Sequence, residues 1–158
     1  MKLDKILVPL DGSVLAEAAL WKAAEISNGG TLSLLRAAEA HSLLGADQID
    51  AQVAAVKEAE EYLATVARRL ADRGMKSVET HVWYGPPAAA IVEAAQVHKV
   101  DLIVMSTHGR SGLGRLILGS VAESVLRGTR TPILVVRADS APVEPQWGAA
   151  PAKEPTRV

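Results

Sequence analysis

The sequence predicts an α/β fold of three layers, with a doubly wound parallel sheet of five strands and four helices. Short apolar runs of strand length alternate along the chain with longer segments whose apolar residues recur at helical spacing. The runs are largely continuous, which is typical of strands that helices cover on both faces. Glycines and prolines mark several of the boundaries between the two kinds of segment.

The first three elements follow from local patterns. The first strand is predicted at residues 5–10, a short apolar run. A helix is expected from Ser13, a good capping residue, to about Asn28, where a Gly-Gly pair ends it. Residues 31–37 form a second apolar run and hence a second buried strand.

The middle of the chain continues the alternation. Residues 38–46 show no clear period and are expected to form a loop, and a long amphipathic helix then runs from Asp47 until Gly74 stops it. Residues 78–84 are the third predicted strand. A Gly-Pro-Pro turn begins the third helix, which ends near His98, because proline fits the first turn of a helix.

The fourth strand is predicted at residues 101–105, the fourth helix at 120–127 and the last strand at 132–136. Beyond this point prolines and small residues replace the apolar pattern. We therefore expect one domain at residues 1–137 and a flexible tail at residues 138–158, which cannot bury enough surface to fold.

Composition excludes several classes of function. The formal net charge of −1 favours neither nucleic acid nor an anionic membrane as a partner. No apolar run approaches the roughly 20 residues of a spanning helix, and the first residues lead into a strand, not a signal peptide. Cysteine is absent, which excludes disulfides, thiolate zinc sites and thiol catalysis. We expect a cytoplasmic protein.

A glycine-rich, arginine-bearing loop runs from Ser106 to Arg115 and is closed by Gly119 and Ser120. Between a strand and a helix, backbone amides of such a loop favour an anion such as phosphate. The spacing comes close to the phosphate-binding loop of nucleotide hydrolases. However, Leu116 stands where that motif needs a hydroxyl for Mg²⁺, so that mechanism is unsupported.

The loop after the first strand carries Asp11. Ligands of open parallel sheets bind beyond the carboxyl ends of strands where the strand order reverses. If the first and fourth strands are neighbours there, Asp11 faces the glycine-rich loop, and its carboxylate can accept hydrogen bonds from ribose hydroxyls. The alternative is that Asp11 caps the first helix or bonds its own turn.

Together these residues resemble the universal stress protein family, over roughly residues 2–137. The resemblance rests on the strand and loop at residues 6–13, the turn at 85–87 and the block at 101–136. The last block is the specific part of the resemblance.

The ATP-binding branch of that family carries the motif G-x2-G-x9-G-(S/T). Here Gly109, Gly119 and Ser120 match its second half, and Ser106 stands in place of the first glycine. A serine fits that position if its φ is negative and is strained if φ is positive.

The resemblance implies a Rossmann-like sheet of order 3-2-1-4-5 and a homodimer joined through the last strand, Pro132 to Val136. It also implies ATP as the ligand and leaves open whether Mg²⁺ or Mn²⁺ accompanies it. Asp11 would meet the ribose, Ala37 the adenine, and Ser120 the phosphates. The full set of implied nucleotide-binding residues is Pro9, Leu10, Asp11, Ala37, Met105, Ser106, His108, Gly109, Gly119, Ser120 and Val121.

The leading hypothesis is a cytoplasmic ATP-binding stress-response or regulatory protein that acts as a nucleotide-dependent homodimer on an unknown protein partner. The alternative is a dimeric interaction module of the same family that does not bind nucleotide, for which Ser106 is the sequence support. A slow ATP hydrolase is the weakest hypothesis, because no general base, metal-binding carboxylate cluster or loop lysine is visible. His41, His81 and His98 show no metal-ligand spacing, and no catalytic or metal-binding residue is predicted.

Overall fold

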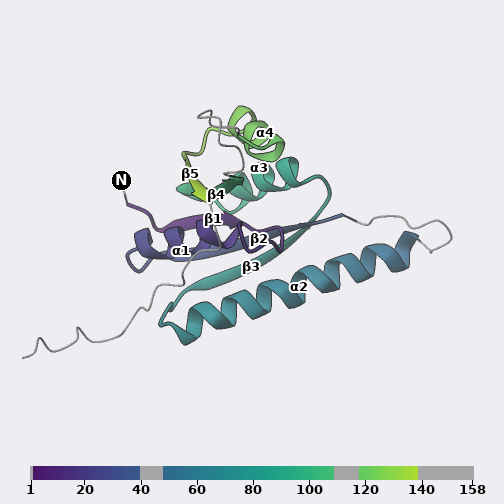
Figure 1. The fold of residues 1–158 in the computed structure, drawn as a ribbon, viewed down its shortest axis with the longest axis horizontal. Coiled ribbons are helices and arrows are strands. Elements are labelled where there is room, and N and C mark those ends of the chain that lie inside the picture. Colours follow the sequence, from purple (N-terminus) through teal and green to yellow (C-terminus); the bar gives the residue numbers. More distant parts are fainter. Residues whose placement is uncertain (1, 40–47, 109–117, 139–158) are drawn as a thin grey trace, which may run out of the picture.

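Five parallel strands lie at the centre of the molecule in the order β3-β2-β1-β4-β5 (Figure 1). The computed structural model describes residues 2–39, 48–108 and 118–138. Its elements are β1 (Lys5–Pro9), α1 (Glu17–Ile26), β2 (Thr31–Ala38), α2 (Gln48–Asp72), β3 (Val78–Tyr84), α3 (Pro87–Val97), β4 (Leu102–His108), α4 (Ser120–Gly128) and β5 (Ile133–Ala138). The predicted class and the strand order implied by the resemblance are confirmed.

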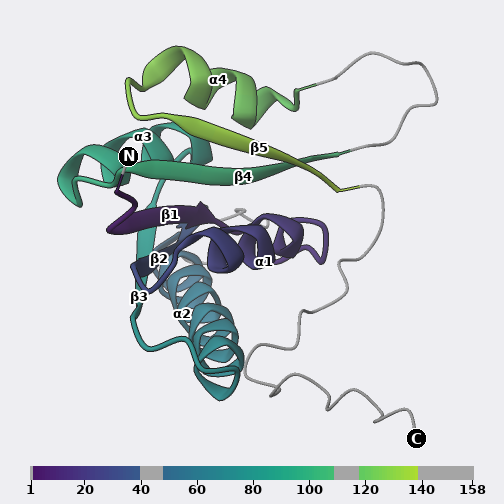
Figure 2. The ribbon, with the colours of Figure 1, turned by 90° about the vertical axis from the view of Figure 1, so that its left-hand side faces the viewer.

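α1 and α2 pack on one face of the sheet, and α3 and α4 pack on the other (Figure 2). Ile6 and Val8 of β1 belong to the buried cluster under α1 and α2, whereas Leu7 between them belongs to the cluster under α3 and α4. All three side chains are fully buried. Because consecutive strand residues point to opposite faces, a continuous apolar run is what a strand between two helical layers requires.

Some element boundaries differ from those predicted from the sequence. α1 begins at Glu17, because the Ser13 hydroxyl oxygen accepts the Ala16 N–H at 3.2 Å and so caps a turn that precedes the helix. β4 continues beyond its predicted end to His108, where it pairs with Ala138 at the end of β5. This pairing stabilises the longer strand. A local sequence pattern cannot predict it, because the paired residues are far apart along the chain.

β1 and β4 are the neighbours at which the strand order reverses. β1 pairs with β2 through all five of its residues, but its register with β4 covers only Ile6 with Leu102 and Leu7 with Ile103. Pro9, at the end of β1, has no N–H to donate. The carboxyl ends of these two strands therefore border a space that backbone pairing does not fill.

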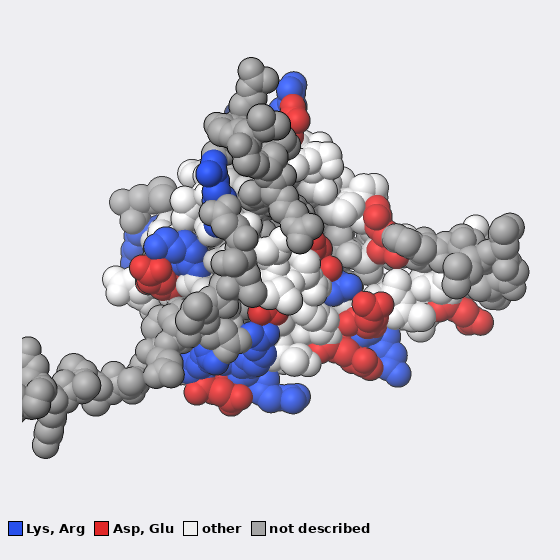
Figure 3. Space-filling model, in the orientation of Figure 1, with Lys and Arg blue, Asp and Glu red and all other residues white. Residues whose placement is uncertain are grey.

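Acidic and basic side chains are intermixed on the face shown in Figure 3, including the part over α2. Ion pairs join Lys57 to Glu61 along α2 and Arg69 of α2 to Glu17 of α1. Within the described ranges, no helix is both long enough and apolar enough to cross a bilayer.

Candidate functional site

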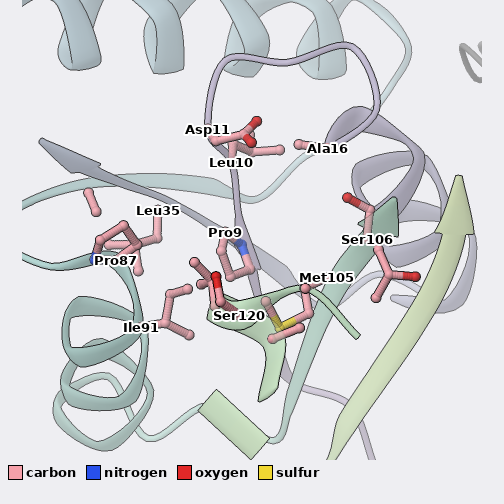
Figure 4. A pocket seen from close by; sticks show the side chains of 15 residues that line it. Pro9, Leu10, Asp11, Ala16, Leu35, Pro87, Ile91, Met105, Ser106 and Ser120 are labelled. Carbon is pink, nitrogen blue, oxygen red and sulfur yellow. The ribbon is translucent and has the colours of Figure 1, made fainter. Parts of the chain in front are cut away.

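A cavity of about 370 Å³ lies at the carboxyl ends of β1, β2 and β4 (Figure 4). This volume is within the range typical of small-molecule sites. The strands contribute one wall, and the first turns of α3 and α4 contribute the others. The lining residues are Pro9, Leu10, Asp11, Ala16, Leu35, Ala37, Pro87, Ile91, Met105, Ser106, Thr107, Gly119, Ser120, Val121 and Ala122.

Nine of the eleven residues expected from the sequence line this cavity. They are Pro9, Leu10, Asp11, Ala37, Met105, Ser106, Gly119, Ser120 and Val121. His108 ends β4 and pairs with Ala138. Gly109 and the rest of the glycine-rich loop up to residue 117 lie outside the described residues.

Asp11 supplies the one formally charged side chain among the residues that line the cavity. Its carboxylate oxygen Oδ1 accepts the backbone N–H of Ser13 at 2.8 Å, and the side chain is exposed. Asp11 therefore does form a hydrogen bond within its own turn, as in the alternative interpretation of the sequence. It does not exclude a ligand role, because a carboxylate has several lone pairs and the bond to Ser13 fixes its orientation.

The opposite chemistry comes from the start of α4. The first hydrogen bond of that helix runs from the Glu123 N–H to the Gly119 carbonyl at 2.9 Å. The amides of Ser120, Val121 and Ala122 therefore precede the helical ladder, and all three residues line the cavity. Amides that precede the helical ladder and the positive end of the helix dipole favour a negatively charged group at this wall.

Gly119 leaves open space where a side chain would stand. Its φ of −61° and ψ of 157° suit any residue, and a Cβ atom built on it would have nothing within 4 Å. Among the described residues, neither backbone conformation nor crowding requires a glycine here. Glycine is common at the N-cap of a helix, and at this wall of the cavity it also leaves the backbone accessible to a ligand.

Ser106 occupies the motif position where a glycine was expected. It lies in β4, and among the described non-glycine residues only Asn28 and Lys99 have positive φ. The condition under which serine would be strained is thus not met. Its side chain lines the cavity beside Met105 and Thr107.

Six lining residues were not predicted from the sequence. Pro87 and Ile91 lie one turn apart on α3, and Leu35 lies two residues before Ala37 on β2, so their side chains share a wall. Figure 4 shows Leu35, Pro87 and Ile91 together on one side of the cavity. The others are Ala16, Thr107 and Ala122. The Gly-Pro-Pro turn was the available signal for Pro87, whereas the apolar residues look like ordinary core in the sequence.

The cavity thus offers an apolar wall, one carboxylate and one helix start to a ligand. This combination suits a molecule with a flat apolar part, hydroxyl groups and an anionic group. Among the residues that the structure describes, no group of three or more His, Cys, Asp or Glu side chains could hold a metal ion.

Comparison with known families decides the classification. The model of the universal stress protein family matches residues 2–137. The chain belongs to the universal stress protein family. A Staphylococcus aureus member is 31% identical over 145 residues, which are 88% of this chain and 87% of that protein. A universal stress protein of Methanocaldococcus jannaschii is 44% identical over 81 residues, so this match spans 51% of our chain and about half, 47%, of the archaeal protein.

Solved structures of the family share the fold of this universal stress protein. One, in complex with cAMP, has a TM-score of 0.67 at 24% identity, with 87% of this chain and 99% of that chain covered. Another, from Arabidopsis thaliana with AMP bound, has a TM-score of 0.62 at 15% identity, with 86% and 92% covered. At these identities the likeness establishes the architecture.

Proposed function

We propose that this universal stress protein binds ATP in the cavity between β1, β2 and β4 and acts as a cytoplasmic, nucleotide-dependent regulatory protein. The observation that carries the proposal is that Asp11 and the first residues of α4 line one cavity. The carboxylate accepts hydrogen bonds, whereas the helix start attracts negative charge. A ligand with both hydroxyl groups and an anionic group, such as ATP, suits the two together.

The parts of ATP match the walls of the cavity. The adenine would lie against Leu35, Ala37 and Ile91, where the lining is apolar. The ribose would reach Asp11, whose free carboxylate oxygen can accept its hydroxyl groups. The phosphates would meet the amides of residues 120–122 and the hydroxyl of Ser120.

Related structures support an adenine nucleotide. The cAMP and AMP of the two structures described above share the adenosine and one phosphate with ATP. In an open parallel sheet such as this one, the carboxyl ends of the strands at the reversal of strand order are where such a ligand is expected to bind.

The nucleotide test uses the purified full chain. Protein unfolded after purification should release adenine nucleotide, or the emptied protein should be stabilised when ATP is added. At 100 times the Kd, ATP would raise the stability by about 2.7 kcal/mol, which moves the Tm by roughly 5–10 °C for a domain of this size. GTP at the same concentration should have a smaller effect. No released nucleotide and no shift at millimolar ATP would favour the interaction module that does not bind nucleotide.

We further propose a homodimer joined through β5. This strand is a sheet edge, paired with β4 alone, and the side chains of residues 133–136 are only half-buried. An apolar edge strand of this kind is a template for pairing with a second copy. Val135 is the residue to change, because it belongs to neither buried cluster, unlike its neighbours.

Val135→Lys should convert the dimer into a monomer, as measured by light scattering of the eluting protein. Val97→Lys is the matched control, because Val97 is 64% exposed at the far end of α3 and should leave the assembly unchanged. A wild-type protein that elutes as a monomer would refute the homodimer without bearing on nucleotide binding.

A further inference from the structure

Arg36 lies in β2 between Leu35 and Ala37, two residues that line the cavity. Because consecutive strand residues point to opposite faces, the Arg36 side chain points to the face covered by α1 and α2. There its guanidinium stands 4.9 Å from the centre of the Tyr62 ring, and its Nη2 donates to Glu58 Oε1 at 3.1 Å. The side chain is only 18% exposed, so α2 holds this cation in one position.

Gly12 is the point at which Arg36 meets the turn after β1. Gly12 has a φ of +85°, and a Cβ atom built on it would lie 2.5 Å from Arg36 Nη1 and 3.3 Å from Arg36 Cζ. The guanidinium therefore packs against the Gly12 backbone with no room for a side chain between them. The positive φ favours glycine, and a side chain at this position would also have to displace the guanidinium.

The turn that Arg36 supports is the one that carries Asp11. On one side of it the Leu10 N–H donates to the Leu35 carbonyl at 2.8 Å, which anchors the end of β1 to β2. On the other side the Ser13 N–H donates to Asp11 Oδ1. Gly12 lies between these two bonds; it is exposed, and the atoms nearest to its built Cβ belong to the Arg36 guanidinium.

We propose that Arg36 is a positioning residue of the nucleotide site: through Gly12 it fixes the turn so that the Asp11 carboxylate faces the ribose of the ligand. This role rests on the function proposed above. Arg36 is not among the residues that line the cavity, so it acts through the turn and not by contact with nucleotide. It also connects the site to α2, because Glu58 and Tyr62 hold the guanidinium in place.

The test compares ATP with 2′,3′-dideoxy-ATP, which lacks the ribose hydroxyls, by calorimetric titration of the full chain. Wild-type protein should prefer ATP about tenfold or more, because hydrogen bonds to a charged acceptor are among the strong ones. Asp11→Ala should abolish this preference. Arg36→Met should reduce the preference for ATP toward the Asp11→Ala value. The double variant should show the same preference as Asp11→Ala alone, because both residues act on one interaction.

Arg69→Met is the matched control. Arg69 lies on α2 and forms a two-pronged pair with Glu17 at 3.0 Å for both bonds, and its guanidinium stands over the ring of Trp21 on α1. The Arg69→Met variant should have a lower Tm than the wild type. Its ratio of the Kd for 2′,3′-dideoxy-ATP to the Kd for ATP should be unchanged. If Arg36→Met does not fold, Arg36→Lys replaces it, because lysine keeps the charge but lacks the planar group that covers Gly12.

The outcomes separate the two proposals. A folded Arg36 variant that keeps the wild-type ratio would overturn the positioning role and leave nucleotide binding intact. A wild-type protein that does not bind ATP would overturn both. Equal loss of affinity for ATP and for the dideoxy analogue in Arg36→Met would also count against the role, because it would indicate a general structural effect.

Discussion

Ser106 lies opposite Val136 in the parallel register of β4 with β5. A residue in this pairing has an extended backbone, which serine adopts without strain. The first glycine of the family motif is thus replaced at a position where the described backbone does not need glycine. The serine side chain instead becomes part of the cavity wall.

Ser106→Gly should leave the affinity for ATP nearly unchanged and destabilise the protein by about 0.5–1 kcal/mol, because glycine in a strand loses more conformational freedom on folding. Calorimetric titration and urea unfolding measure the two effects. ATP binding that appears only in the glycine variant would instead mean that the serine blocks the site.

Gly119→Ala should fold and bind ATP poorly. The backbone there accepts alanine, the space is open, and alanine as a helix cap costs about 1 kcal/mol or less. A methyl group in the path of the phosphates should weaken binding about tenfold, equivalent to about 1.4 kcal/mol. Gly128→Ala, at the other end of α4, is the control: its Cβ would meet Val92 at 3.1 Å, so it should affect stability and not affinity. If Gly119→Ala binds ATP with wild-type affinity, the phosphates do not bind at the start of α4.

Tyr62 should titrate far above an ordinary tyrosine. Burial, with the nearby Glu17 carboxylate, raises its pKa to about 12, although Arg36 acts in the opposite direction. The neutral phenol is therefore favoured in the folded state, and this contribution to stability is present below pH 10 and lost as pH rises toward 12. Absorbance of the phenolate should show a step near pH 12 that Tyr62→Phe removes. A Tyr62 step near pH 10 in folded protein would contradict the packing around Arg36.

His81 should make the protein less stable in mild acid. Its ring stacks on His98 with centroids 3.9 Å apart, and burial followed by the charge of His98 lowers its pKa, against the opposing effect of Glu79. The unfolded chain then binds the proton more readily, so stability is complete above about pH 6.5 and declines as pH falls below it. Urea unfolding between pH 7.5 and 5.5 measures this slope, which His81→Gln should flatten. An equally steep slope in that variant would assign the acid sensitivity to other groups.

The sequence predicted the layers of the fold because each strand is a local apolar run and each helix a local period. It could not determine which face each buried residue joins: Leu34 packs under α1 and α2, whereas its neighbour Leu35 packs on the other side. Both residues are apolar, and they differ only in the face of the sheet to which their side chains point. The strand order came from the family resemblance, since right-handed crossovers alone left several topologies open.

The site was predicted where its residues are chemically distinctive, at Asp11, Gly119 and Ser120. The apolar lining residues Leu10, Ala37, Met105 and Val121 were expected only from the family resemblance, because an apolar residue beside a cavity has the same sequence signature as one in the core. Leu35 and Ile91 were missed because the resemblance did not include them. Arg36 was missed for a related reason. Its part depends on contacts with Gly12 and Tyr62, which are distant along the chain and meet only after folding.

The most direct test of the central claim is a crystal structure of the protein grown with saturating ATP. We predict adenine density against Leu35 and Ala37, ribose hydroxyls within hydrogen-bonding distance of Asp11, and phosphates at the amides of residues 120–122. An empty cavity under these conditions, or a nucleotide bound elsewhere on the molecule, would contradict the account.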